Sequence, residues 1–325
     1  MTASNSVSTD KKGAIAITGA TGFIGSTIAR HLIAAGWRVR CLVRSLPRAR
    51  LKLSCFDQLD MVEGSLEDSS SLRKLVEGCR VVVHCAGTVR GAHVHHFNRV
   101  NVEGVASLVR ITREVADSPS FFLLSSLAAR EPHLSAYAAS KKKGEQQLAF
   151  LAGDMPWVVL RPPAVYGPGD REILPLFRLM EKGVAPLVGD RRSRFSLLYV
   201  DDLSAAVCSF LKQPAWSQSI YELHDGHGGG YSWDEVIAVF SRLRAKKLLK
   251  VQVPLSLLSV SAQVNQMLSP LLGKHPMLTP GKIRELKHLD WVCDNQVITE
   301  QTGWQPRVDL AEGLRRTMGW QAVKR

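Results

Sequence analysis

Short apolar runs alternate with amphipathic stretches along the first half of the chain. The apolar runs cover residues 14–17, 37–44, 81–87, 121–126 and 157–161, and a weaker candidate covers 60–63. Runs of this length that are rich in β-prone residues indicate buried strands, whereas the amphipathic stretch Ser26–Ala35 indicates a helix that ends at Gly36. Strands that alternate with helices predict an α/β fold with a parallel sheet.

A glycine-rich turn joins the first predicted strand to the first predicted helix. Gly19, Gly22 and Gly25 all lie in the segment Thr18–Gly25. Gly19 permits a tight turn, Gly22 lets backbone N–H groups approach a pyrophosphate, and Gly25 allows the helix to pack closely on the strand. Strand, turn and helix in this order predict a dinucleotide-binding unit, with an ordinary βα turn as the alternative.

The glycine spacing G-x-x-G-x-x-G resembles the extended branch of the short-chain dehydrogenase/reductase superfamily, a Rossmann-fold group of epimerases, dehydratases, hydroxysteroid dehydrogenases and ketone reductases. The resemblance covers about residues 13–320 and includes the segments Asn101–Gly104, Tyr137–Lys141, Arg161–Pro168, Val200–Asp202 and Thr302–Pro306. It implies a doubly wound parallel Rossmann sheet with a smaller, mainly helical C-terminal substrate domain.

The resemblance also implies how the chain is divided. We expect residues 1–12 to form a disordered tail rather than a signal peptide, because they lack an apolar core. Residues 13–165 and the returning segment 196–224 are expected to form the cofactor domain. Residues 166–195 and 225–325 are expected to form the substrate-binding region. No run of about 18 apolar residues predicts a membrane span.

Family resemblance further implies a set of cofactor contacts. Ser65 stands where relatives usually place an aspartate that contacts the adenine, so that contact is in doubt. The expected cofactor-binding residues are Gly19, Thr21, Gly22, Phe23, Ile24, Gly25, Arg44, Ser65, Leu66, Ala86, Gly87, Tyr137, Lys141, Pro162 and Val165.

Arg44 ends the second predicted strand, where an acidic residue would bind the adenosine ribose of NAD. Arg48 and Arg50 come close behind it. A ribose 2′-phosphate would meet cations there, so the sequence favours NADP(H) over NAD(H). The alternative is that Arg44 caps a solvated strand end.

Three residues carry the expected chemistry. Tyr137 and Lys141 are spaced to lie one turn apart on one helix face and match the family's Y-x-x-x-K pair. A phenol titrates near ~10, and we expect Lys141 and an oxidised nicotinamide to favour the phenolate. The resemblance implies that Tyr137 is the acid/base, that Lys141 also binds the nicotinamide ribose, and that Ser126 holds the substrate oxygen.

The segment after Ser126 bears on the substrate. Leu127, Ala128 and Leu134 make it partly apolar, and the aromatic residue usual in nucleotide-sugar enzymes is absent. We therefore expect an NADP(H)-dependent oxidoreductase that interconverts a ketone and a secondary alcohol on a hydrophobic substrate, such as a steroid or a 3-keto sphingoid or ceramide-like lipid. One alternative is a nucleotide-sugar epimerase or dehydratase with Arg161 and Arg191–Arg194 as diphosphate contacts. Another is a non-catalytic, cofactor-binding accessory subunit.

Charge and cysteine content narrow the possible partners. The formal net charge is +13, but the basic residues are dispersed and no nucleic-acid-binding signature accompanies them. The six cysteines form no C-x-x-C pair, no His/Cys grouping has metal-ligand spacing, and free thiols suit a reducing compartment. We expect a cytoplasmic protein with no metal and no nucleic-acid partner. A homodimer is left open.

The C-terminal third contains one unusual apolar run. Trp233–Leu249 is predicted to be an amphipathic basic helix, and Val251–Leu272 is mainly apolar. Lys246, Lys247 and Lys250 precede this run and Lys274 follows it. The run fits helices packed on the substrate domain, a lid over a lipid-accepting pocket, or a peripheral contact with the inner face of an anionic membrane.

Overall fold

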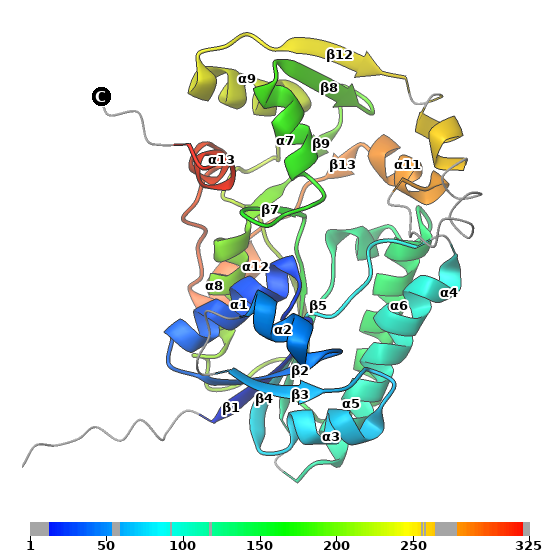
Figure 1. The fold of residues 1–325 in the computed structure, drawn as a ribbon, viewed down its shortest axis with the longest axis vertical. Helices are drawn as coiled ribbons and strands as arrows, with labels where there is room; N and C mark the ends of the chain where they lie inside the picture. Colours follow the sequence, from blue (N-terminus) through cyan, green and yellow to red (C-terminus); the bar gives the residue numbers. More distant parts are fainter. Residues whose placement is uncertain are drawn as a thin grey trace, which may run out of the picture.

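Seven parallel strands form the central sheet in the computed structural model, which describes residues 13–53, 59–91, 93–116, 119–254, 256, 258–263 and 278–320 (Figure 1). The strand order is β11-β6-β5-β4-β1-β2-β3. The sheet is built from β1 (Ala14–Thr18), β2 (Arg38–Val43), β3 (Leu59–Glu63), β4 (Cys79–His84), β5 (Ser120–Leu124), β6 (Trp157–Arg161) and β11 (Ser219–Glu222).

Helices cover both faces of this sheet, and each face has its own apolar core. One core includes side chains of α1 (Phe23–Ala34), α8 (Val200–Phe210) and α12 (Gln296–Thr302), and α2 (Leu46–Lys52) adds Ala49. The other includes side chains of α3 (Ser69–Val76), α5 (Gly104–Glu114) and α6 (Ala136–Leu151). The predicted doubly wound parallel α/β sheet is therefore confirmed.

Three short segments lie at the carboxyl edge of the sheet, where ligands bind in open α/β folds. They are α4 (Val94–Asn98), the π-helical turn η2 (Arg99–Glu103) and the 3₁₀ turn η3 (Leu127–Arg130). The strand β11, far along the chain, pairs in parallel with β6 and extends the sheet.

A smaller region lies above this edge in Figure 1 and has a third apolar core. Helices of this region include α7 (Leu174–Glu181), α9 (Trp233–Arg244), α11 (Pro280–Lys287) and α13 (Leu310–Met318). Three two-stranded parallel sheets join them, formed by β7 (Ala164–Tyr166) with β10 (Leu197–Tyr199), β8 (Val184–Val188) with β12 (Leu249–Val253), and β9 (Arg194–Phe195) with β13 (Asp290–Trp291).

One element of this region differs from the sequence-based expectation. The predicted helix Trp233–Leu249 ends at Arg244, where Ala245 adopts a left-handed conformation with φ of 48°. Leu249 already belongs to β12, which pairs with β8. Val251–Val253 are therefore strand rather than helix. Residues 255, 257 and 264–272 of the apolar run lie outside the described residues.

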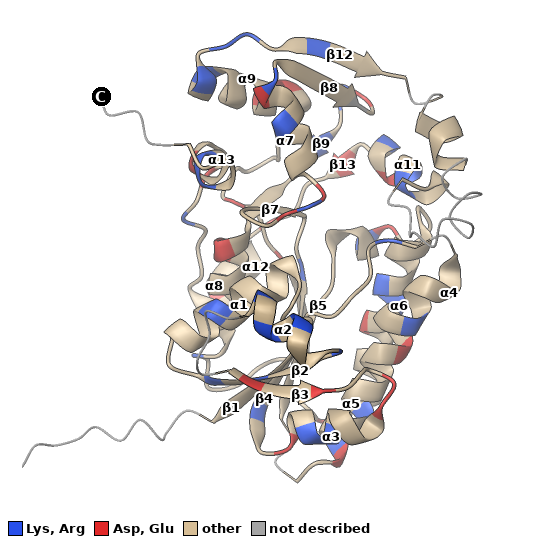
Figure 2. Ribbon diagram, viewed as in Figure 1, with Lys and Arg blue, Asp and Glu red and all other residues tan. Residues whose placement is uncertain are grey.

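Lys and Arg positions are spread along the ribbon of both regions (Figure 2). Across the described ranges, no helix combines the length and the apolar character needed to cross a bilayer.

Candidate active site

The glycine turn after β1 is packed too tightly for any larger residue. Gly19 has φ of +76°, and a Cβ there would lie 2.7 Å from the backbone nitrogen of Ala86. A Cβ on Gly25 would lie 2.2 Å from the carbonyl oxygen of Gly19. The backbone N–H of Gly22 donates to that same oxygen at 2.9 Å. These contacts bring the start of α1 against the end of β1.

The first turn of α1 is open to an anion. Gly22 occupies the N-cap position without a side-chain cap, and the first turn carries no acidic residue. Phe23, Ile24 and Gly25 line a large cavity that extends from this turn. Free N–H groups and the positive end of the helix dipole suit a pyrophosphate, so the residues present fit a dinucleotide cofactor.

The arginines expected near the adenosine ribose are not among the residues that line this cavity. Arg44 is exposed after β2 and does not line the cavity, and neither do Ser65, Leu66 and Ala86. Lys52, at the end of α2, does line it, and its Nζ lies 3.5 Å from the carbonyl oxygen of Thr21. Sequence reasoning missed Lys52 because the helix that presents it was not predicted.

The end of β4 is tied to β1 by a buried histidine. Thr18 Oγ1 lies 2.8 Å from His84 Nδ1 and accepts a hydrogen bond from Ala86 N at 3.2 Å. Burial lowers the pKa of His84 to about 3, and the charge of Lys141 acts in the same direction. A neutral His84 therefore fixes the backbone beside Gly87, which lines the cavity.

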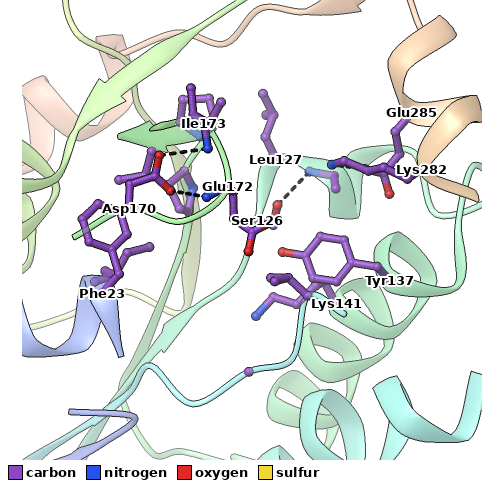
Figure 3. A pocket seen from close by; sticks show the side chains of 18 of the residues that line it. Phe23, Ser126, Leu127, Tyr137, Lys141, Asp170, Glu172, Ile173, Lys282 and Glu285 are labelled. Carbon is purple, nitrogen blue, oxygen red and sulfur yellow. Dashed lines mark hydrogen bonds and ion pairs between the residues drawn. The ribbon is translucent and has the colours of Figure 1, made fainter. Parts of the chain in front are cut away.

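Ser126, Tyr137 and Lys141 face one cavity (Figure 3). Ser126 follows β5 and accepts a hydrogen bond from Ala128 N at 3.2 Å. Tyr137 and Lys141 lie one turn apart near the start of α6, whose N-cap is Ser135. Pro162 and Val165, also expected at the cofactor, line the same cavity, as do Thr21 and the three glycines.

The phenol of Tyr137 does not have the pKa expected from the sequence. It opens onto the cavity, yet burial in the surrounding protein raises the pKa of Tyr137 to about 12. The neighbouring Ser126 hydroxyl opposes this rise, and the carboxylates of Glu285 and Glu172 add to it. The ammonium of Lys141 donates to the carbonyl oxygen of Leu124 at 2.7 Å. Burial therefore outweighs the lowering expected from Lys141, and the further lowering expected from an oxidised nicotinamide stays a prediction.

Lys141 itself is buried, and desolvation lowers its pKa to about 8. The negative charge of Glu145 opposes this shift. Because a pKa of about 8 lies above neutral pH, most of the protein carries a charged Lys141 at pH 7.

A buried ion pair supports the strand ends beneath these residues. Arg161 donates to both carboxylate oxygens of Glu145, at 2.8 and 2.6 Å. Ser125 Oγ donates to Glu145 Oε1 at 2.6 Å. Ser126, rather than Ser125, is therefore the hydroxyl left beside Tyr137. Sequence reasoning missed Glu145, although it lies one turn after Lys141 on the same helix.

The arginines considered as diphosphate contacts have protein partners. Arg161 is held by Glu145, and Arg191 pairs with Asp234 at 3.1 Å. Arg192 pairs with Asp190 at 2.7 Å, and Arg194 donates to the carbonyl oxygens of residues 229 and 230. These contacts weaken the nucleotide-sugar alternative.

The cavity has a volume of about 1300 Å³ and runs from the glycine turn to the smaller region. Its lining surface is mainly apolar, and the apolar side chains include Val89, Val94, Phe97, Leu127, Ile173, Leu176, Phe177, Phe195, Trp233, Val236, Leu286 and Trp291. Polar and charged side chains interrupt this lining, among them Asp170, Arg171, Glu172, Arg194, Lys282, Arg284, Glu285 and His288. Apolar walls with few convergent polar groups are typical of sites for hydrophobic ligands.

Known proteins share this architecture. The family model of the NAD dependent epimerase/dehydratase family matches residues 15–223. Ceramide reductase of Caulobacter vibrioides is 36% identical over 315 residues, which cover 97% of this chain and 96% of that protein. Sterol-4-alpha-carboxylate 3-dehydrogenase of Schizosaccharomyces pombe is 22% identical over a match that covers 94% of this chain and 96% of that protein.

Among solved structures, UDP-glucuronic acid 4-epimerase of Bacillus cereus in complex with NAD has a TM-score of 0.74 at 18% identity. The match covers 94% of this chain and 98% of that one, and at this identity it shows the fold alone. The family match spans the glycine turn, the Tyr137–Lys141 pair and the sheet. The chain belongs to the NAD dependent epimerase/dehydratase family and is an NAD(P)-dependent enzyme of the extended short-chain dehydrogenase/reductase type.

Proposed function

We propose that this enzyme interconverts a ketone and a secondary alcohol on a hydrophobic, ceramide-like lipid. The observation that carries the proposal is the placement of Ser126, Tyr137 and Lys141 on a cavity whose lining surface is mainly apolar. The 36% identity to a ceramide reductase over nearly the whole chain supports the same substrate class.

The side chains have distinct roles in this proposal. The Ser126 hydroxyl donates a hydrogen bond to the substrate oxygen and aligns it with the phenol of Tyr137. Tyr137 donates its proton to that oxygen during reduction and takes it back during oxidation. When bound, the nicotinamide cofactor supplies or accepts the hydride. Because the pKa of Tyr137 is about 12, the phenol is protonated at neutral pH and is ready to act as the acid.

A substrate comparison with one tyrosine variant tests this proposal. We expect NADPH oxidation with a 3-keto ceramide or a steroid ketone and none with UDP-glucose. Tyr137→Phe should lower kcat by about a hundredfold or more, because only the proton-transfer group is lost, while NADPH still binds in a fluorescence titration.

The matched control is Tyr221→Phe, which removes the hydroxyl of a buried tyrosine on β11. Tyr221 does not line the cavity, so this change should leave kcat unchanged. Turnover of UDP-glucose, or a Tyr137→Phe enzyme within a few-fold of the wild type, would refute the proposal.

We further propose that the cofactor is NADP(H). The exposed cations Arg44, Arg48 and Arg50 follow β2, and Lys52 reaches the cavity from the same helix, α2. Together they give a ribose 2′-phosphate a cationic environment.

Replacement of Arg44 by Asp should reverse the preference for NADPH over NADH, because a carboxylate repels the phosphate and accepts hydrogen bonds from ribose hydroxyls. Dissociation constants from fluorescence titration measure this preference. Arg38→Asp, at the opposite end of β2, should leave the preference unchanged. Tighter binding of NADH by the unaltered protein would show that the arginine argument is wrong.

We also propose a peripheral contact between β12 and an anionic membrane. Leu249 and Val251 are exposed by 66% and 40%, which is unusual for apolar strand residues. The exposed Lys246 and Lys247 immediately precede the strand. Apolar side chains flanked by lysines complement a surface of acyl chains and anionic headgroups.

A further inference from the structure

Helix α11 packs against the start of α6, the helix that carries Tyr137 and Lys141, and forms hydrogen bonds with it. Glu285 on α11 hydrogen-bonds the hydroxyl of Ser135, two residues before Tyr137. Arg284 Nε donates to the carbonyl oxygen of Leu134 at 2.7 Å. A Cβ on Gly281 would lie 2.8 Å from Ser135 Cβ, so the two helices are in close contact. The wall that α11 forms is therefore fixed relative to the reacting groups.

Lys282 extends from this helix toward the part of the cavity that holds Ser126 (Figure 3). Its Nζ donates to Glu285 Oε2 at 2.9 Å, and both side chains line the cavity. Glu285 is buried, whereas the Lys282 side chain is 38% exposed. An ammonium group has three donors, so Lys282 has hydrogens to spare for a ligand beyond the one given to Glu285.

We propose that Lys282 is a specificity-determining residue that donates a hydrogen bond to an uncharged oxygen beside the substrate ketone, such as an amide carbonyl or a hydroxyl. Glu285 is its positioning residue, because the carboxylate holds both Lys282 and Ser135. The inference rests on the proposed function and deepens it: it explains how a mainly apolar cavity would select a lipid with a polar head next to the ketone.

The charges around Tyr137 favour a neutral acceptor over an anion. Glu285 offsets the charge of Lys282, and Glu172, which lines the same cavity, is itself paired with Arg90 at 2.7 Å. Both carboxylates add to the rise in the pKa of the Tyr137 phenol that burial causes. Arg284 lines the cavity too, but its Nε is turned to the Leu134 backbone. A phosphate on the substrate head would therefore have to compete with the Glu285 carboxylate for Lys282, whereas an uncharged oxygen needs only one of the spare hydrogens of the ammonium.

The test compares Lys282→Met with Lys287→Met, which removes an exposed lysine from the same helix. One substrate is a short-chain N-acyl 3-ketosphinganine, which bears an amide and a hydroxyl. The other is a long-chain 3-alkanone of equal length, which bears neither. Lys282→Met should lower kcat/KM for the amide substrate by about tenfold or more and leave that for the alkanone within about twofold. Lys287→Met should change neither value.

One more variant and one more substrate distinguish a failure of the role given to Lys282 from a failure of the proposed function. Lys282→Arg retains a hydrogen-bond donor and should recover most of the kcat/KM for the amide substrate. In a separate measurement, the 1-phosphate ester of that substrate should be a poor substrate of the unaltered enzyme. An equal fall on both ketones, no fall on either, or a preference for the phosphate ester would overturn the role given to Lys282. An unaltered enzyme that reduces neither ketone would instead overturn the proposed function.

Discussion

Tyr137 shows how one residue's chemistry depends on neighbours distant in sequence. The pKa of its phenol is raised to about 12 by burial, lowered by the hydroxyl of Ser126, and raised by Glu285 and Glu172. Glu285 comes from a helix more than a hundred residues away. Removing its charge should lower the pKa of Tyr137, because a nearby negative charge disfavours the phenolate.

This leads to a prediction on pH dependence. Oxidation of the alcohol needs the phenolate, so its rate rises with pH until the pH reaches the pKa of Tyr137. In Glu285→Gln the rise should move to lower pH, and the oxidation rate at pH 9, relative to its plateau, should increase. A pH profile of kcat for oxidation measures the shift. Glu300→Gln, an exposed change on α12, serves as the control, and identical profiles for Glu285→Gln and the unaltered enzyme would contradict the prediction.

At the scale of elements, β5, β6 and α6 meet at one buried carboxylate. Glu145 on α6 accepts hydrogen bonds from Arg161, the last residue of β6, and from Ser125, the residue after β5. The side chains of Glu145 and Arg161 are only 2% and 12% exposed. Water cannot replace either partner there, so the pair fixes the strand ends relative to the catalytic helix.

Glu145→Ala should therefore destabilise the protein by about 3 kcal/mol, because it removes both short hydrogen bonds of the buried Arg161 and leaves only the longer ion pair with Glu222 at 3.7 Å. The matched control is Glu312→Ala, which breaks the exposed Glu312–Arg316 pair on α13 and should cost less than about 1 kcal/mol. Urea denaturation followed by circular dichroism gives both free energies of unfolding. If the two variants prove equally stable, the buried pair does not hold these elements together.

At the scale of the whole molecule, the cavity lies between the sheet and the smaller region, and β12 lies on the outer side of that region (Figure 1). The sequence suggested four lysines for a membrane contact. In the structure Lys250 contacts Asp234, and Lys274 lies outside the described residues. The proposed contact therefore rests on Lys246 and Lys247 beside exposed Leu249 and Val251.

We expect the protein to sediment with anionic vesicles at low salt and to be released as ionic strength rises, because headgroup attraction is screened. Lys246→Glu combined with Lys247→Glu should weaken sedimentation, since each lysine near such a surface contributes about 1 kcal/mol. The control is Lys74→Glu combined with Lys212→Glu, which reverses two exposed charges of the sheet region. It should have little effect on sedimentation. Absence of sedimentation of the unaltered protein at low salt would rule out the membrane contact. Lys246→Glu combined with Lys247→Glu should leave the reduction of a short soluble ketone unchanged.

The sequence alone determined the parts of the protein that depend on local spacing. The strand, glycine turn and helix around Thr18–Gly25 were predicted because each follows from a few consecutive residues. The shared face of Tyr137 and Lys141 follows from the four-residue spacing on one helix. The order of apolar runs then predicted the parallel sheet, since strands linked by helices pair in that way.

Tertiary structure decided what depends on residues far apart in the chain. Leu249–Val253 became a strand because β8, some sixty residues earlier, offers it an edge to pair with. Lys282 and Glu285 reach the cavity because α11 docks on α6. The pKa of Tyr137 rises because burial is a property of everything packed around the phenol. Local spacing fixes which face a side chain occupies, whereas desolvation and pairing depend on which distant segments meet it.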